Sequence, residues 1–229
     1  MIVSSGNEKK AVVLVSGGID SSTTLALATK KNYSCFALTI NYGQRHHIEI
    51  EFAKKICKAF NVKAHKVIDI DLTRIGGSAL TDPAIQVPES HASGIPVTYV
   101  PARNTIMLSI ALGWAEVIDA DAIFVGANAV DYSGYPDCRP EYIKSFEKMA
   151  NLATKRGLEG RLISINAPLI DMTKAEIIKL GESLNVDFSA TVSCYQANSS
   201  GAACGVCDSC RIRRDGFEKA LVQDPTVYS

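Results

Sequence analysis

Several features typical of membrane and nucleic-acid-binding proteins are missing from this 229-residue sequence. No apolar run approaches the roughly 18 residues needed to cross a membrane, and residues 1–10 are polar, without the apolar segment of a secretion signal. Lys plus Arg and Asp plus Glu both number 24, so the formal net charge is zero, which argues against a general nucleic-acid binder. We therefore expect a cytoplasmic protein with no membrane partner and no nucleic-acid partner.

Two familiar nucleotide-binding motifs are missing as well. The chain has no Walker sequence, which requires a lysine after its second glycine, and no Gly-x-Gly-x-x-Gly fingerprint. Instead, the apolar residues 12–15 lead into Ser-Gly-Gly-Ile-Asp-Ser at 16–21. A strand, a glycine turn and a helix in this order can form a phosphate cradle, because backbone N–H groups and the helix dipole face one concavity. The pattern resembles the pyrophosphate loop of the N-type ATP pyrophosphatases; the alternative is an ordinary glycine turn.

Asp20 is out of place in a site for phosphate alone, because a carboxylate repels the anion. A bridging Mg²⁺ would resolve the conflict, since this cation binds carboxylate and phosphate oxygens together. The sequence therefore predicts ATP and Mg²⁺ as ligands of the glycine loop.

The apolar pattern indicates an α/β fold. The chain is 47% hydrophobic and 21% charged, which suits one domain with a small appendage. Strands and helices that alternate along the chain predict a parallel sheet with right-handed crossovers. The expected strands are 12–15, 35–42, 64–70, 121–126 and 162–166, and the expected helices are 22–31, 48–60, 105–117, 141–156, one from 173, and 208–221. Residues 71–98 are interpreted as a flexible excursion that acts as a lid.

A polar loop follows the strand expected at 121–126, at the sheet edge where ligands of parallel sheets bind. Tyr132 and Tyr135 could stack on a flat heteroaromatic ligand, and Asp131 and Asp137 could bind its hydrogen-bonding edge. The alternative for this segment is a solvated turn.

Two basic residues lie at predicted helix starts. Arg103, followed by Asn104, precedes the helix expected at 105–117, where a guanidinium could donate two hydrogen bonds to phosphate. Lys174 lies inside a capping box formed by Thr173 and Glu176. A cation is unfavourable at a helix start unless an anion is near. Both residues are therefore candidate contacts for phosphate or for a substrate carboxylate, and solvated surface positions are the alternative.

Four of the seven cysteines lie within residues 194–210. Tetrahedral zinc binds four thiolates on tight turns of this kind, so Cys194, Cys204, Cys207 and Cys210 predict one structural zinc ion. An iron–sulfur cluster is the second choice, because the ferredoxin run continues with a further cysteine and a proline, where this chain has arginine and aspartate.

These motifs together resemble the 7-cyano-7-deazaguanine synthase family over nearly the whole chain. The most specific likeness is Asp-Tyr-Ser-Gly-Tyr-Pro-Asp-Cys-Arg at 131–139, together with the four cysteines; the glycine loop alone is shared with many synthetases. Further matching stretches are 42–46, 100–104, 168–169 and 174–176. Ser22 stands where the family more often has threonine, which keeps the hydroxyl.

The resemblance implies a Rossmann-like, three-layer α/β domain of the adenine nucleotide alpha hydrolase type at 1–190 and a zinc-binding subdomain at 191–229. It implies ATP contacts at Val15, Ser16, Gly17, Gly18, Ile19, Asp20, Ser21, Ser22, Thr23, Thr24 and Leu25. The implied phosphate or substrate contacts with catalytic roles are Asp20, Arg103, Asn104 and Lys174. The implied substrate-binding residues are Tyr42, Gln44, Arg45, Asp131, Tyr132, Tyr135, Asp137 and Arg139.

The implied activity is an ATP-dependent ligation in queuosine precursor biosynthesis that converts 7-carboxy-7-deazaguanine and ammonia to the nitrile. Adenylation gives the carboxylate a better leaving group than oxide, ammonia then forms the amide, and a second activation permits dehydration. Ammonia is expected from solution, because a glutamine-hydrolysing unit would need about another domain's length. A homodimer is expected.

Two other functions stay open on the sequence. One is a tRNA-modifying relative that inserts sulfur with an iron–sulfur cluster; it should carry a basic RNA-binding region, which zero net charge does not suggest. The other is a non-catalytic zinc module that senses a nucleotide and regulates a partner. ATP binding without turnover would indicate the second.

Overall fold

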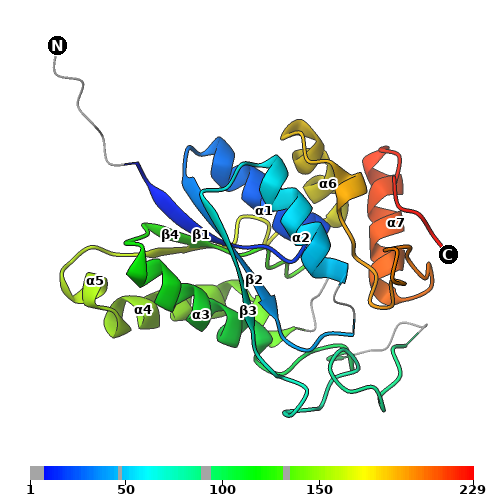
Figure 1. The fold of residues 1–229 in the computed structure, drawn as a ribbon, viewed down its shortest axis with the longest axis horizontal. Helices are drawn as coiled ribbons and strands as arrows, with labels where there is room; N and C mark the ends of the chain where they lie inside the picture. Colours follow the sequence, from blue (N-terminus) through cyan, green and yellow to red (C-terminus); the bar gives the residue numbers. More distant parts are fainter. Residues whose placement is uncertain (1–7, 46–47, 89–93, 131–134) are drawn as a thin grey trace.

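A parallel sheet forms the centre of the molecule (Figure 1). The computed structural model describes residues 8–45, 48–88, 94–130 and 135–229. Within them the sheet has the order β3-β2-β1-β4-β5, with every neighbouring pair parallel. The chain runs outward from β1 to β3 and then returns to the other side of β1, so the carboxyl ends of β1 and β4 flank a topological switch point. The strands are β1 (Lys10–Leu14), β2 (Ser34–Asn41), β3 (Ala64–Asp69), β4 (Ala122–Phe124) and β5 (Ser164–Asn166).

Helices cover both faces of the sheet, which confirms the predicted α/β architecture (Figure 1). One face carries α1 and α2, the other carries α3 and α4, and α6 and α7 pack together beside α1. The helices are α1 (Ile19–Lys30), α2 (Ile48–Ala59), α3 (Arg103–Val117), α4 (Pro140–Ala153), α5 (Lys155–Leu158), α6 (Lys174–Ser183) and α7 (Asp208–Ala220), with 3₁₀ turns η1 (Pro136–Cys138) and η2 (Phe188–Ala190).

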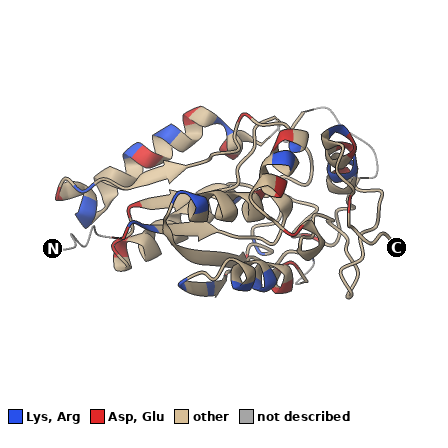
Figure 2. Cartoon of the chain, turned by 90° about the horizontal axis from the view of Figure 1, so that it is seen from above, with Lys and Arg blue, Asp and Glu red and all other residues tan. Residues whose placement is uncertain are grey.

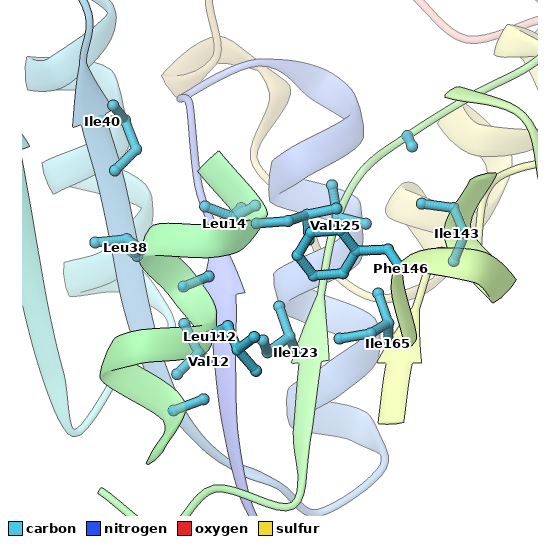
Figure 3. Packing of buried hydrophobic residues seen from close by; sticks show 14 of the residues in the cluster. Val12, Leu14, Leu38, Ile40, Leu112, Ile123, Val125, Ile143, Phe146 and Ile165 are labelled. Carbon is cyan, nitrogen blue, oxygen red and sulfur yellow. The ribbon is translucent and has the colours of Figure 1, made fainter. Parts of the chain in front are cut away.

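Alternate side chains of β1 enter two different cores, because successive residues of a strand point to opposite faces. Val12 packs in one core with Leu112 of α3 (Figure 3). Val13 packs in the other with Leu25 of α1 and Ile56 of α2. Burial on both faces explains why this strand reads as an uninterrupted apolar run.

Three predicted helix boundaries were wrong. The first helix begins at Ile19 rather than Ser22, because the backbone is already helical after Gly18 and the Ser22 hydroxyl donates to Gly18 O at 2.8 Å. The helix expected at 141–156 ends at Ala153, where the extended backbone of Thr154 interrupts it and caps α5. Helix α3 begins at Arg103, two residues before the predicted start.

Charges of both signs alternate along the outer helices (Figure 2). On α2, for example, Lys54 pairs with Glu51 at 2.8 Å, and both side chains are more than half exposed. None of the helices in the described ranges is long and apolar enough to span a bilayer.

Candidate active site

A cavity of about 250 Å³ lies at the carboxyl ends of β1, β2 and β4. Its lining comes from the glycine loop, the exits of β2 and β4, the first turns of α2 and α3, and α7. The sequence-predicted residues that line it are Val15, Ser16, Gly18, Ile19, Asp20, Ser21, Tyr42, Gln44, Arg45, Arg103, Asn104, Tyr135 and Lys174. The topology brings these distant residues together because parallel strands end at one edge of the sheet.

The backbone of the glycine loop is fixed by its contact with α2. Gly17 has φ +86°, and a Cβ there would lie 2.6 Å from Glu49 O and 2.8 Å from Ala53 N. Gly17 O also accepts a hydrogen bond from Val192 N at 2.9 Å. Gly18, by contrast, has an ordinary φ of −88°. Only the first of the two glycines therefore uses the conformational freedom that the sequence pattern suggested.

Part of the predicted ATP-binding set stabilises the loop or the first helix instead of lining the cavity. Ser21 Oγ accepts a hydrogen bond from Ser16 N at 3.1 Å, which closes the loop on itself. The remaining members of the set, Gly17, Ser22, Thr23, Thr24 and Leu25, do not line the cavity. The four of them that belong to α1 are buried.

Asp20 and Lys174 form an ion pair at the cavity, with Lys174 Nζ 2.6 Å from Asp20 Oδ1. Their side chains are 19% and 8% exposed, respectively. The predicted capping box of Thr173 and Glu176 is confirmed. A cation at this helix start needs a nearby anion, and Asp20 supplies one. Both residues line the cavity, so the pair places one negative and one positive charge at its surface.

Tyr42, which follows β2, contacts Arg103, the first residue of α3. Both residues line the cavity. Arg103 Nη1 donates to the Tyr42 hydroxyl at 3.3 Å, and the guanidinium lies 5.7 Å from the centre of the ring. Burial raises the pKa of Tyr42 above its ordinary value, so the phenol stays neutral. Tyr135 is also buried, and its hydroxyl is 3.1 Å from Thr98 Oγ1. These groups offer aromatic surface and one positive charge to a ligand.

Asp137 caps α3 rather than lining the cavity. The N-cap residue, Ala102, has φ +54° and no capping side chain. Asp137 Oδ2 instead accepts from Asn104 N at 2.9 Å, and Asn104 Nδ2 donates back to Asp137 O at 3.2 Å. Arg139 is exposed and donates to Pro136 O at 3.0 Å. The segment therefore positions Asn104 at the cavity.

Two further predicted substrate residues, Asp131 and Tyr132, lie outside the described residues. Their assignment stays a prediction.

Arg45 holds the long excursion against the site. Its Nε donates to Ala79 O at 2.6 Å, and Nη2 donates to Asp82 O at 3.0 Å and to Ile85 O at 2.5 Å. Gln44 Oε1 accepts from Tyr42 N at 2.8 Å. Both side chains thus also support backbone around the cavity, and the lid role of residues 71–98 stays a prediction.

Sequence reasoning missed several cavity-lining residues. Glu49 reads as an ordinary acidic residue in the first turn of a helix, yet it lines the cavity, and burial raises its pKa to about 7. Arg213 of α7 is 2% exposed and donates to Thr191 Oγ1 at 2.9 Å. For Arg213, the signal available in the sequence was its helical spacing from the apolar residues Cys210 and Phe217.

The four predicted cysteines gather in one cluster, with their sulfur atoms within 4.8 Å of one another. Cys194 Sγ accepts N–H bonds from Gln196 and Cys204, both at 3.2 Å. The contact between Cys194 and Cys207 raises the pKa of Cys194 to about 12 and holds that of Cys207 well below its ordinary value. Crowded thiols with bound N–H donors suit a cation, so this cluster could hold a metal ion.

A family model described as "Queuosine biosynthesis protein QueC" matches residues 10–221. The chain belongs to this family. The enzyme named 7-cyano-7-deazaguanine synthase from Saccharophagus degradans is 64% identical over 223 residues, covering 97% of this chain and 99% of that protein. The enzyme of the same name from Coxiella burnetii is 60% identical over 221 residues, covering 96% and 98%.

Membership of the QueC family confirms the resemblance predicted from the motifs and the assignment to an enzyme of queuosine biosynthesis. It decides against the tRNA-modifying and nucleotide-sensing alternatives. Among solved structures, an NMN synthetase from Francisella tularensis matches with a TM-score of 0.52 at 19% identity, covering 95% of this chain and 79% of that chain. At this identity the match supports the fold alone.

Proposed function

We propose that this chain uses ATP to convert 7-carboxy-7-deazaguanine and ammonia to 7-cyano-7-deazaguanine. The observation that carries the proposal is the family match over residues 10–221, which spans every cavity-lining segment. The cavity joins an anion-binding loop to aromatic surface, as a reaction between a nucleotide and a flat base requires.

The glycine-loop group, defined as Ser16, Gly18, Asp20, Ser21 and Lys174, is proposed to bind the ATP phosphates. Lys174 can move from Asp20 toward phosphate within the same cavity. The Asp20 carboxylate would then hold Mg²⁺, a hard cation that prefers oxygen ligands and neutralises charge developing on phosphate. The protein's contribution is positioning and charge stabilisation.

A second set, the distributed group, lines the rest of the cavity, and all of its members except Glu49 are proposed to bind the base and orient its carboxyl group. It comprises Tyr42, Glu49, Arg103, Asn104 and Tyr135. Arg103 can bind the substrate carboxylate before activation, and the tyrosines can stack on the ring. Asp131, Tyr132, Asp137 and Arg139 complete the predicted substrate set, with Asp137 acting through Asn104.

The test is a mass-spectrometric assay of the purified chain with ATP, Mg²⁺, ammonium and 7-carboxy-7-deazaguanine. The expected products are the amide at early times and the nitrile at late times. Glutamine in place of ammonium should give no product, because a glutamine-hydrolysing unit would need about another domain's length. Absence of both products with ammonium would contradict the proposal.

Zinc is the proposed occupant of the cysteine cluster. Four protein thiols would fill a tetrahedral site and leave no position for water or substrate, which indicates a structural ion. The cluster adjoins α7, since Cys207 precedes its first residue and Cys210 lies in its first turn. Zinc would therefore fix the helix that brings Arg213 to the cavity. The division into units 1–190 and 191–229 remains a prediction.

We also propose a cytoplasmic location and a homodimer. All seven cysteines are free of disulfides, and clustered cysteines that bind metal are typical of compartments that keep thiols reduced. Strongly exposed apolar side chains near the junction of α3, α4 and α5, namely Val117 at 81%, Leu152 at 78% and Leu158 at 81%, support an interface there. Light scattering on Leu158→Glu and wild-type protein tests the dimer, since the charged variant should be monomeric.

A further inference from the structure

The proposed reaction has a proton requirement that the glycine-loop group does not meet. Ammonia that adds to an activated carboxyl carbon must lose a proton to give the amide. The amide nitrogen must lose its remaining protons when the carbon–oxygen bond to AMP breaks and the nitrile forms. The site therefore needs a proton acceptor beside the reacting nitrogen, active near neutral pH.

Most titratable groups that line the cavity are unsuited to this task. The Asp20 carboxylate pairs with Lys174 at 2.6 Å and is assigned above to hold Mg²⁺. Burial raises the pKa of the Tyr42 phenol, and it raises that of the Cys138 thiol to about 11, so both retain their protons. Among the described cavity-lining residues, Glu49 is the remaining carboxylate.

Glu49 is held at the cavity by backbone rather than by its side chain. A Cβ on Gly17 would lie 2.6 Å from Glu49 O, so the first turn of α2 rests directly on the glycine loop. Its carboxylate makes no hydrogen bond or ion pair with a described residue. The charged and titratable groups that face it are Arg103 from α3 and Tyr42 from the exit of β2. The carboxylate thus lines the cavity near Arg103 and Tyr42, and it is free to accept a proton.

We propose that Glu49 accepts protons from the reacting nitrogen, first when ammonia adds to the activated carboxyl carbon and again when the amide becomes the nitrile. The inference rests on the proposed function. In the first step a C–N bond forms, the C–O bond to AMP breaks, and the ammonium proton passes to a Glu49 oxygen. In the second, the amide oxygen has been adenylated by a second ATP with release of pyrophosphate, and AMP leaves with this oxygen as the C–O bond breaks. One N–H electron pair becomes part of the C≡N bond, the other stays on nitrogen as its lone pair, and the two protons pass in turn to Glu49. Solvent removes each proton afterwards, and no oxidant or reductant is needed.

The electrostatic surroundings of Glu49 suit a proton acceptor. Burial raises the pKa of the carboxyl to about 7, and the Arg103 charge partly offsets that increase. A base with a pKa near the working pH combines a useful deprotonated fraction with a strong drive to accept a proton.

The test separates the adenylation step from the nitrogen steps. Carboxylate-dependent ATP–pyrophosphate exchange, measured without ammonium, involves no nitrogen proton. Glu49→Gln should leave this exchange within about threefold of wild type and reduce amide and nitrile formation by at least about 10²-fold, the usual effect of a general base. Glu49→Asp should recover part of the loss. Glu51→Gln, a matched change at an exposed position of the same helix, should match wild type in every assay.

The pH dependence provides a second readout. Nitrile formation from supplied amide by wild-type protein should rise as pH increases through about 7, because the carboxylate must be deprotonated. In Glu49→Gln that rise should disappear, a change that a purely structural role would not produce.

Three results would overturn the inference. Full product formation by Glu49→Gln would show that another group takes the protons. Equal loss of exchange and product formation would place Glu49 in substrate binding. A raised Mg²⁺ requirement for exchange would make it a metal ligand. Wild-type protein without exchange and without product would instead contradict the proposed function itself, and this inference with it.

Discussion

The glycine-loop group and the distributed group meet in one cavity but are held in place by different means. Most of the first comes from the contiguous residues 16–21, closed by short local bonds such as Ser16 N to Ser21 Oγ at 3.1 Å. The second is collected from β2, α2, α3 and the segment before η1, and it depends on contacts such as Arg103 to Tyr42 at 3.3 Å. The comparison teaches that the loop backbone of the first group is closed by local bonds that do not involve the charge of Asp20. In the second group, charge and assembly are coupled.

Asp20→Asn should produce the largest effect on turnover. It should impair the glycine-loop group and leave the distributed group intact. Removing the carboxylate removes the proposed Mg²⁺ ligand, so kcat should fall by roughly 10²–10³-fold, as for loss of one electrostatic contact. Lys174 loses its charged hydrogen bond to the Asp20 carboxylate, which should lower the free energy of unfolding by about 1–3 kcal/mol. Steady-state kinetics and thermal melts measure the two. Asp215→Asn, in an exposed pair with Lys219, is the control.

Near-normal activity of Asp20→Asn at limiting Mg²⁺ would contradict the proposed cation site. A large loss in Asp215→Asn would show that the assay responds to surface charge in general.

The difference between local and long-range contacts explains how much of the site could be predicted from the sequence. The glycine loop, the Thr173–Glu176 capping box and the four cysteines are short-range patterns, and all are confirmed as local structure. The ion pair between Asp20 and Lys174 joins residues 154 positions apart, so no local pattern reveals it. The sequence near Lys174 predicts that a cation at this helix start needs an anion. It does not predict that Asp20 is that anion.

Glu49 and Asp137 show that a sufficient local explanation can also hide a tertiary role. A glutamate in the first turn of α2 satisfies the helix dipole, so its type and position already had a sufficient local explanation. Asp137 seemed suited to bind a base edge, but tertiary packing uses its carboxylate to cap α3. The α/β fold was predictable because alternating apolar segments determine it; the roles of single carboxylates depend on contacts that no spacing encodes.

Cys207→Ser should affect both groups together, because the cysteine cluster adjoins α7 and α7 lines the cavity. Loss of one thiolate should abolish stoichiometric zinc, with about one ion per chain expected in wild type. The melting temperature and the folded yield should fall, and activity should fall in proportion to folded protein. Elemental analysis, thermal melts and specific activity measure these. Cys57→Ser, at a buried thiol outside the cluster, is the control for introducing a hydroxyl.

Stoichiometric iron and sulfide in the wild type would contradict zinc. A folded, zinc-free and inactive Cys207→Ser protein would give the metal a part in the chemistry.

Gly17→Ala should sharpen the comparison where the glycine loop rests on α2, the helix that carries Glu49. The substitution places a methyl 2.6 Å from Glu49 O at φ +86°, so the glycine loop and α2 must separate. Gly160→Ala is a matched control, because its φ is +77° and nothing lies within 4 Å. Both should lose about 1–2 kcal/mol from the left-handed backbone, and only Gly17→Ala should lose more and lower kcat. Equal melting temperatures in the two variants would contradict the contact between loop and helix.

The smallest expected effect is a pH-dependent stability difference at Glu49, and it tests the coupling of charge and assembly in the distributed group. Burial raises the folded-state pKa of Glu49 to about 7, above the ordinary 4.5. Between these values the folded chain binds a proton that the unfolded chain has released, so the free energy of unfolding falls as pH rises through this window. Glu49→Gln removes the titration, and its stability relative to wild type should increase between pH 4.5 and pH 7 by at most about 1.4 kcal/mol per pH unit. Urea denaturation of both proteins across this range measures the difference, with Glu51→Gln as the exposed control. A pH-independent difference would mean that the carboxyl titrates normally in the folded chain, and that Glu49 is already charged when the cavity is empty.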